Sequence, residues 1–370
     1  MTETTCAVSA VPTMTNTIYI NPLAERLSDA YKDDFSVESN SQETFLEILN
    51  LLGAKREARK VQIRDLKFYP MPNSKEVVDQ FEDDEVLQLI ARDSIKNDTR
   101  VFVEYGKRPI MLRTTAMPSI FDRLHISGDI LSAIPKGMLA QHLNDYAQYT
   151  SGTALLIENN GKGEALLGQK YKLTPAEEIM EEAAAFFGEN NFEKGMYSHS
   201  FISAIWNLGE TRIQIPFDED GNDLVFDQTV TVSTSDNGRK AISVVPMMRL
   251  KNDRIGLSYC LPLRMEHNGK SGIEEFRKML DLIDKRFDDA NQYISKLLDI
   301  DLRYPANVLL AMCKFLKIPG KYGAPVYENR KIMWAKQTHT AYEVYSALSE
   351  ILSLVLGENQ SEQTLAEYRE

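Results

Sequence analysis

The chain has 370 residues, of which 43% are hydrophobic and 26% are charged, and its formal net charge is −12 at pH 7. These are the proportions of a globular protein that is long enough for two cores or for one large mixed domain. The negative charge argues against a general coat of nucleic acid, because a uniformly acidic surface repels phosphate. It does not exclude a local basic site.

Signals for export and membrane insertion are absent from the sequence. The first residues lack a basic segment followed by an apolar run, and no stretch approaches the roughly 18 apolar residues of a membrane helix. Three widely separated cysteines, Cys6, Cys260 and Cys313, have no metal-ligand spacing and suggest a reducing compartment. We therefore expect a cytoplasmic protein with no membrane partner.

The first hundred residues begin with weak patterns and then become regular. Residues 1–38 are rich in Thr, Ser, Asn and Asp, which predicts a flexible N-terminal arm. An apolar stripe over 39–53, capped by Ser39, predicts a helix. A strand is expected at 61–72 and a second helix at 74–93.

From residue 100 onward the chain alternates short strands and helices. Asn160-Gly161 is the dipeptide preferred in tight hairpin turns, and Thr174-Pro175 is typical of a helix start. The pattern between 210 and 265 is that of β-strands, and after 271 it is helical. Strand runs flanked by helix runs predict an α+β fold, with antiparallel sheets built from hairpins, flanking helices and a helical C-terminal third.

These patterns also predict a division of the chain into four segments. They are a flexible arm at 1–38, an α+β core at 39–270, a helical region packed on the core at 271–357, and an acidic tail at 358–370.

The stretch from Thr229 to Val245 contains Ser235, Asp236, Asn237 and Gly238 in a row, which is either a reactive loop or the bend of a hairpin. A two-residue turn at Asn237-Gly238 explains every residue and pairs Val232 with Ser243. A nucleophilic serine would need a base and an orienting group, and neither stands at a recognisable spacing. The sequence therefore favours the hairpin.

Motifs for catalysis, metals and cofactors are missing. The acidic run at 217–223 fails the calcium-loop pattern because Pro216 occupies its first position. Five histidines form no zinc pair, and the glycines at 161–168 lack phosphate-loop spacing. We expect no cofactor and no metal. If an active site is assembled from distant residues, the place to look is around His267, with Arg264 and Glu266.

The distribution of charge is the strongest functional signal. From Arg303 to Lys336 the chain carries seven basic residues against Glu328 alone, which gives +6 in a chain whose total is −12. Tyrosine and tryptophan are interleaved with these cations, and this mixture is typical of surfaces that bind phosphates and stack bases. The candidate nucleic-acid-binding residues are Lys314, Lys317, Lys321, Tyr322, Arg330, Lys331, Trp334 and Lys336.

A second basic run lies at 53–68, where six cations face two carboxylates. The alternative interpretation of both runs is that they are solvated faces, paired with acidic helices elsewhere in the same protein. In a net acidic chain the two interpretations carry equal weight.

The order of several short motifs resembles a family of phage- and plasmid-encoded proteins of unknown function, described as phage/plasmid-like proteins. The resemblance runs over roughly 100–356. Its landmarks are "FDRLHIS" with "PKGMLAQHLNDYA", "EALLGQKYKLT", "STSDNGRKAI", "RMEHNGK" and the late helix "TAYEVYSALSEIL". In that helix Ser346 and Ser349 stand where the family usually has Asn and Thr. The resemblance implies a mobile element in a bacterial host cell and carries over no catalytic residue.

Taken together, these features favour a mobile-element accessory protein that binds DNA or RNA through a local basic-aromatic surface, without catalysis. The alternative is a protein-interaction or self-assembling protein that acts on a host protein and does not bind nucleic acid. The oligomeric state stays open.

Overall fold

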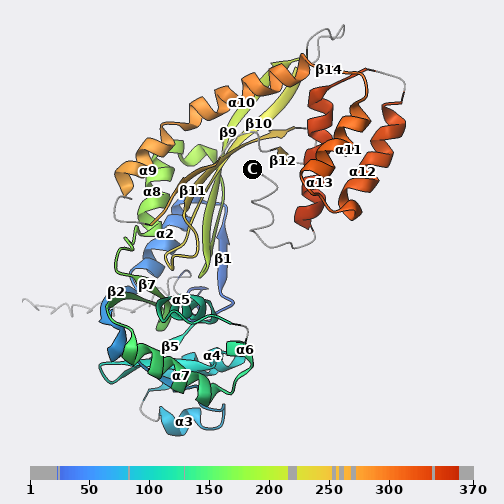
Figure 1. Cartoon of the computed structure of the whole chain (residues 1–370). Coiled ribbons are helices and arrows are strands. Elements are labelled where there is room, and N and C mark those ends of the chain that lie inside the picture. The colour runs from blue at the N-terminus through green and yellow to red at the C-terminus, as the bar shows by residue number, and fades with distance from the viewer. Residues whose placement is uncertain are drawn as a thin grey trace, which may run out of the picture.

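The computed structural model describes residues 23, 26–81, 84–128, 130–215, 223–251, 256–257, 262–267, 272–335 and 338–357. Over these residues the protein has the predicted α+β fold, with two large sheets, a two-stranded sheet and a helical C-terminal part (Figure 1). None of the helices in this part of the chain is both long and apolar enough to cross a bilayer.

The larger sheet, sheet A, has only antiparallel pairs among its described strands. In hydrogen-bonded order its strands are β1 (Ser36–Ser39), β8 (Phe192–Ser198), β9 (Phe201–Gln214), β10 (Asp223–Thr234), β11 (Ile242–Leu250) and β12 (Gly256–Leu257), and β13 (Leu263–Met265) also pairs with β11.

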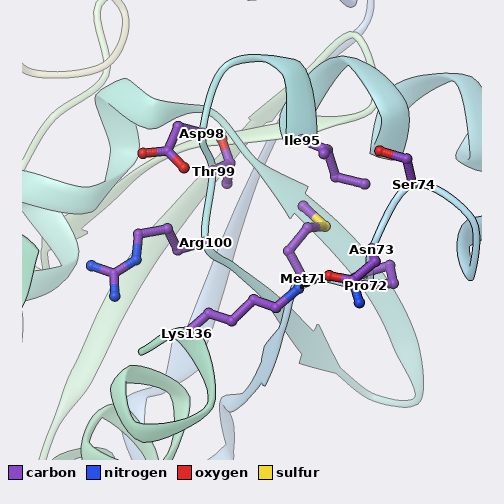
Figure 2. Close-up of a pocket in the computed structure, with 9 residues that line it drawn as sticks. All are labelled: Met71, Pro72, Asn73, Ser74, Ile95, Asp98, Thr99, Arg100 and Lys136. Atoms are coloured by element: carbon purple, nitrogen blue, oxygen red, sulfur yellow. Dashed lines mark hydrogen bonds between the residues drawn. The ribbon is translucent and has the colours of Figure 1, made fainter. Parts of the chain in front are cut away.

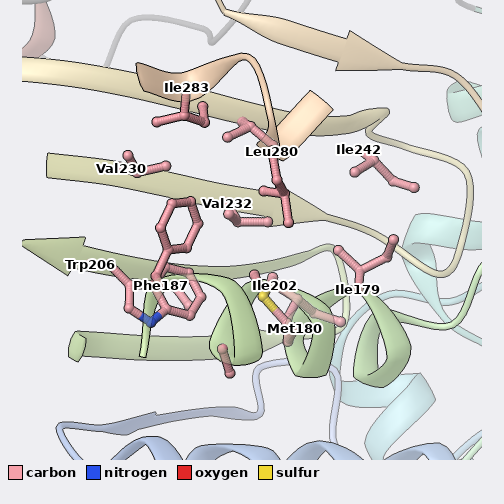
Figure 3. Close-up of a cluster of buried hydrophobic side chains, with 14 of the residues drawn as sticks. Ile179, Met180, Phe187, Ile202, Trp206, Val230, Val232, Ile242, Leu280 and Ile283 are labelled. Atoms are coloured by element: carbon pink, nitrogen blue, oxygen red, sulfur yellow. The ribbon is translucent and has the colours of Figure 1, made fainter. Parts of the chain in front are cut away.

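Four helices share the hydrophobic core of sheet A. In Figure 3, Phe187 and Trp206 lie together below Val230, and their ring centroids are 5.3 Å apart. These aromatic contacts join helix to sheet because each ring removes a large apolar area from water. The four helices are α2 (Gln42–Gly53), α8 (Ala176–Phe187), α9 (Ile273–Leu280) and α10 (Ile283–Leu298).

The smaller sheet, sheet B, is mixed, because β5 and β7 are parallel neighbours while its other pairs are antiparallel. In order its strands are β2 (Arg56–Gln62), β6 (Thr153–Asn159), β7 (Lys162–Gly168), β5 (Arg108–Leu112), β4 (Val101–Tyr105) and β3 (Lys67–Pro70).

Successive side chains of sheet B enter different hydrophobic clusters, as the alternation of a strand requires. Val101 and Val103 pack with α5 (Met117–Arg123) and α7 (Lys136–Tyr149), whereas Phe102 packs with α3 (Val77–Gln80) and α4 (Glu85–Lys96). Helix α6 (Ile130–Ala133) precedes α7.

Sheet B and its helices are inserted into the chain of sheet A. Strand β1 and helix α2 come before them, and α8 returns the chain to sheet A. The two crossings lie side by side, since the Arg56 guanidinium donates to both Glu177 carboxylate oxygens at 3.0 and 2.9 Å. The region predicted as one core at 39–270 thus contains two sheets with separate hydrophobic clusters.

A bundle of three helices follows α10: α11 (Pro305–Phe315), α12 (Gly320–Met333) and α13 (Ala341–Gly357). The bundle has its own hydrophobic cluster, and Tyr342 of α13 anchors it to the core of sheet A. Strands β14 (Asp301–Leu302) and β15 (His339–Thr340) pair just before α11 and α13, so these two helices begin at the same end of the bundle.

The N-terminal segment differs from its prediction. Residues 26–38 are packed rather than loose: Leu27 and Ala30 are buried, and Arg113 donates to the carbonyls of Ala30, Tyr31 and Lys32 at 3.1 Å each. Backbone carbonyls satisfied by a buried guanidinium hold this segment in place. Most of the rest of the predicted arm, and the predicted tail at 358–370, lie outside the described residues.

The predicted hairpin at 229–245 is confirmed, but its register differs by one residue, because Val232 pairs with Val244. The loop is longer than two residues since its side chains bind its own backbone. The Ser235 hydroxyl accepts from the Lys240 N–H at 2.8 Å, and the Asn237 side chain accepts from the Arg239 N–H at 3.3 Å. Of the two predicted turn residues, only Gly238 has positive φ, 73°.

Candidate nucleic-acid interface

Seven of the eight predicted binding residues are described by the structure, and they differ in exposure and role. Lys314, Lys317, Lys321 and Lys331 are exposed. Arg330 is half-buried and donates to the Glu350 carboxylate of α13 at 2.9 Å, which makes it a bond between two helices. Lys336 lies outside the described residues, and Tyr322 and Trp334 are buried.

Tyr322 and Trp334 are core residues, so their predicted role in stacking on bases is wrong. Their exposed fractions are 3% and 6%, and they pack in one cluster with Leu309 and Ile351. The Lys321 ammonium lies 4.4 Å from the Tyr322 ring centroid. Cations alternate with aromatics in this sequence partly because the cations cover the edges of a small core.

An exposed aromatic ring does lie among the lysines, but it belongs to Phe315. It is 84% exposed at the end of α11, beside Lys314 and close to Lys317 in the chain. Pro305, Leu309 and Cys313 mark the buried stripe of α11 at intervals of four residues, and Phe315 lies off that stripe. This spacing is a signal from which its exposure could have been predicted.

A tight turn between α11 and α12 keeps these residues at one end of the two helices. Lys317 has a φ of 53°, and the Ile318 N–H donates to the Cys313 carbonyl at 2.9 Å. This is the usual way in which an α-helix ends, with one residue in the left-handed conformation just after its last turn. Lys321 follows in the first turn of α12. We call Lys314, Phe315, Lys317 and Lys321 the basic turn. Lysines also suit the negative end of a helix dipole, which is the structural alternative for Lys314 and Lys317.

The second basic run has a structural role at its start. Arg56 is paired with Glu177 and also with Asp236, whose carboxylate oxygen lies 2.5 Å from the guanidinium. Arg59 pairs with Glu57 and Glu158. Both arginines thus pair with carboxylates of the same protein, as the alternative interpretation expected, but Arg56 is buried rather than on a solvated face, and the partners of Arg59 lie on strands and not on an acidic helix.

A buried ionic cluster joins the two sheets, and sequence reasoning missed it. Arg113 and Lys162, 1% and 0% exposed, pair with Asp33, Asp93 and Glu164 at distances between 2.6 and 3.3 Å. These residues come from distant positions, so no local spacing in the sequence indicates the cluster. Charges so enclosed are out of reach of a substrate, and they fix the junction between the sheets.

His199 of the sheet A side completes this cluster. Its Nδ1 lies 3.2 Å from a Glu164 oxygen and 3.3 Å from the Tyr197 hydroxyl. Burial lowers the pKa of His199, and it outweighs the opposing effect of the hydrogen bond with Glu164. The imidazole is therefore neutral near pH 7.

The residues 235–237 of the hairpin loop also belong to the junction, although a surface bend was expected. Ser235, Asp236 and Asn237 are buried. Asp236 accepts from the Ala176 N–H at 3.0 Å, at the start of α8, as well as from Arg56. The loop, like His199, therefore belongs to the part of sheet A that docks against sheet B.

The three residues considered for a dispersed active site do not converge. His267 is buried and stacks on Tyr171, with ring centroids 5.2 Å apart, whereas Arg264 and Glu266 are exposed. Burial lowers the pKa of His267. Among the described residues, no group of three or more His, Cys, Asp or Glu is arranged to hold a metal ion.

The architecture thus defines an α+β protein with an inserted second sheet and a basic turn on a C-terminal bundle. Comparisons with protein-family models, with curated proteins and with solved structures gave no match.

Proposed function

We propose that the protein binds nucleic acid without catalysis, through the basic turn, as an accessory protein of a phage or plasmid. The observation that carries this proposal is the 84% exposed ring of Phe315 within a run of three lysines. Exposure of a phenylalanine ring to water is unfavourable, so covering the ring with a partner lowers the free energy. The lysines attract a polyanion to the same place.

Single-stranded DNA or RNA suits this geometry better than a duplex does. The bases of a single strand can turn outward and stack on an aromatic ring, while its phosphates lie along nearby cations. The net charge of −12 disfavours binding over most of the surface, so a local basic site such as this turn is needed. The mobile-element setting rests on the sequence resemblance alone.

The direct test replaces all three lysines of the basic turn with glutamate: Lys314→Glu, Lys317→Glu and Lys321→Glu. Fluorescence anisotropy with labelled single-stranded DNA, duplex DNA and RNA would measure affinity over a salt series. We expect at least about a tenfold loss of affinity, and a salt slope smaller by roughly 2, since each lost phosphate contact removes about 0.7 on a single strand.

A matched control reverses three exposed lysines in other parts of the molecule: Lys67→Glu, Lys96→Glu and Lys278→Glu. It changes the net charge equally, so an equal loss of binding would contradict a local site. Phe315→Ala should weaken single-strand binding by roughly 1–3 kcal/mol and duplex binding far less. Wild-type protein that binds none of the three probes at low salt would overturn the proposal.

The second candidate is a protein-interaction surface on the same bundle. Ile332 and Met333, at the end of α12, are 78% and 59% exposed, and apolar side chains so exposed are frequent at protein interfaces. Mass photometry that finds a discrete oligomer, together with no binding of nucleic acid, would favour this function over the first.

A further inference from the structure

We propose that a pocket on the sheet B side binds a small phosphorylated sugar, as a free sugar phosphate or as a nucleoside monophosphate. The pocket encloses about 260 Å³ beside the end of β3, the end of α4 and the start of α7. Figure 2 shows Lys136 reaching across it from α7, with Arg100 on one side and Pro72 on the other. We call it the Arg100–Lys136 pocket.

Hydrogen bonds hold both cations of the pocket in place. The Lys136 ammonium donates to the Asn73 side-chain oxygen at 2.7 Å. Asn73 is itself fixed by Glu76, whose carboxylate accepts from the Asn73 N–H and side-chain amide at 3.0 and 3.2 Å. Arg100 donates to the Leu131 carbonyl at 2.6 Å. Cations placed in advance lose little side-chain entropy when an anion binds.

The start of α7 adds to the positive potential. Lys136 is the first residue of this helix, and its N-cap residue Pro135 makes no side-chain capping bond. Helix N-termini favour phosphate because their first N–H groups point outward. The Thr99 side chain, only 4% exposed, forms part of the pocket wall.

The other residues that line the pocket are unsuited to a bare anion and better suited to a sugar. Asp98 lines the pocket, and with Glu76 behind Asn73 it offsets the two positive charges. A carboxylate repels a bare phosphate but accepts hydrogen bonds from hydroxyl groups. Met71 and Ile95 supply apolar surface for a ring. The mixture of an apolar wall with a few polar groups is typical of metabolite pockets.

The pocket is separate from the basic turn, since it lies by α4 and α7 and the turn lies on the bundle (Figure 1). The two proposals therefore stand or fall independently. Substitutions in one site leave the other as an internal control.

Isothermal titration calorimetry of the full chain with ribose 5-phosphate, adenosine 5′-monophosphate, inorganic phosphate and ribose tests the proposal. We expect at least one of the two phosphorylated sugars to bind with micromolar to low-millimolar Kd. Inorganic phosphate alone and ribose alone should each bind at least tenfold more weakly. Lys136→Gln should weaken binding at least tenfold, and Lys67→Ala, outside the pocket, should leave it unchanged.

The Asp98→Asn variant tests the contribution of the sugar hydroxyls to binding apart from that of the phosphate. Asparagine tolerates the φ of 56° at this position, so the backbone is preserved. The variant should lose affinity for the phosphorylated sugars at least fivefold. No binding of either phosphorylated sugar at 10 mM, or binding that Lys136→Gln and Asp98→Asn both leave unchanged in variants with wild-type melting temperatures, would overturn the proposal.

Discussion

At the scale of single residues, the charge state of Asp236 is the most informative feature of the junction. One guanidinium, that of Arg56, serves two carboxylates, those of Asp236 and Glu177, and Glu164 adds a third negative charge nearby. Burial raises the pKa of Asp236 to about 7, against the opposing effect of Arg56. The carboxyl group therefore titrates near neutral pH instead of near its usual acidic range.

Asp236→Asn should change how stability depends on pH. The pKa of Asp236 rises from 3.8 in the unfolded chain to about 7 in the folded protein. Its contribution to stability is therefore fully present below pH 3.8 and is lost as the pH rises through 7, by a total of roughly 4 kcal/mol. Asparagine cannot titrate, so the wild type should lose stability relative to the variant between pH 5 and pH 8.

Urea unfolding of both proteins at pH 5 and pH 8 would measure this difference. A free-energy difference between them that is the same at both pH values would contradict the assignment of the proton to Asp236. His199→Gln is a useful companion variant because its titration has the opposite sign: a lowered histidine pKa destabilises the folded state as the pH falls.

Residue types alone indicated charge but not exposure. The cations near 314–331 were correctly taken from composition, yet composition could not tell that Tyr322 and Trp334 fill a core while Phe315 faces water. The helical spacing of buried positions carries that information for Phe315. The junction and the Arg100–Lys136 pocket combine residues that are far apart in sequence, so no window of one sequence contains either site.

At the scale of elements, the predictions were right where the hydrophobic pattern was continuous. They were wrong where a capping side chain set the start of a helix. The stretch 74–93 was expected to be one helix, but it forms the short α3 and then α4, whose N-cap Asp84 accepts from the Leu87 N–H at 2.8 Å. The first helix begins after Ser41, not after Ser39. A capping carboxylate or hydroxyl competes with helix continuation and creates a new start.

Gly195 of β8 allows α2 to lie close to sheet A. A Cβ atom at this position would meet the Phe45 ring at 2.4 Å, and Phe45 is 1% exposed, so the ring has little room to move. Gly195→Ala should therefore destabilise the protein by roughly 1–3 kcal/mol through overpacking. Differential scanning calorimetry would show this as a lower Tm.

Gly137→Ala is the matched control for that substitution. Gly137 lies in α7, and a Cβ there would meet nothing within 4 Å. Alanine is the better helix former by about 1 kcal/mol, so this variant should be as stable as the wild type or more stable. Equal Tm changes for the two variants would contradict the packing argument.

At the scale of the whole molecule, chain connectivity sets the end of the bundle at which α13 stops. Because α11 and α13 begin together at the β14–β15 pair, the turn after α11 and the end of α13 lie toward the other end of the bundle. Residues 358–370 continue from that end of α13. Four glutamates against one arginine give them a formal charge of −3.

Deletion of residues 358–370 should strengthen binding of single-stranded DNA at low salt, by roughly two- to tenfold, because it removes net negative charge from a chain that has to attract a polyanion. The gain should vanish at about 0.5 M salt, where such charges are screened. Replacing the four glutamates with glutamine in the full chain should reproduce it. Unchanged or weaker binding at low salt would contradict this electrostatic account.

The insertion of sheet B between α2 and α8 has a consequence for protein engineering. Its entry and exit segments are joined by the bidentate Arg56–Glu177 pair, so the ends of the inserted unit lie next to each other. Units whose ends are close together can be exchanged between proteins without rerouting the host chain. The sheet B unit could therefore be replaced by a short linker, or by another domain whose ends are equally close. Either one would connect α2 to α8.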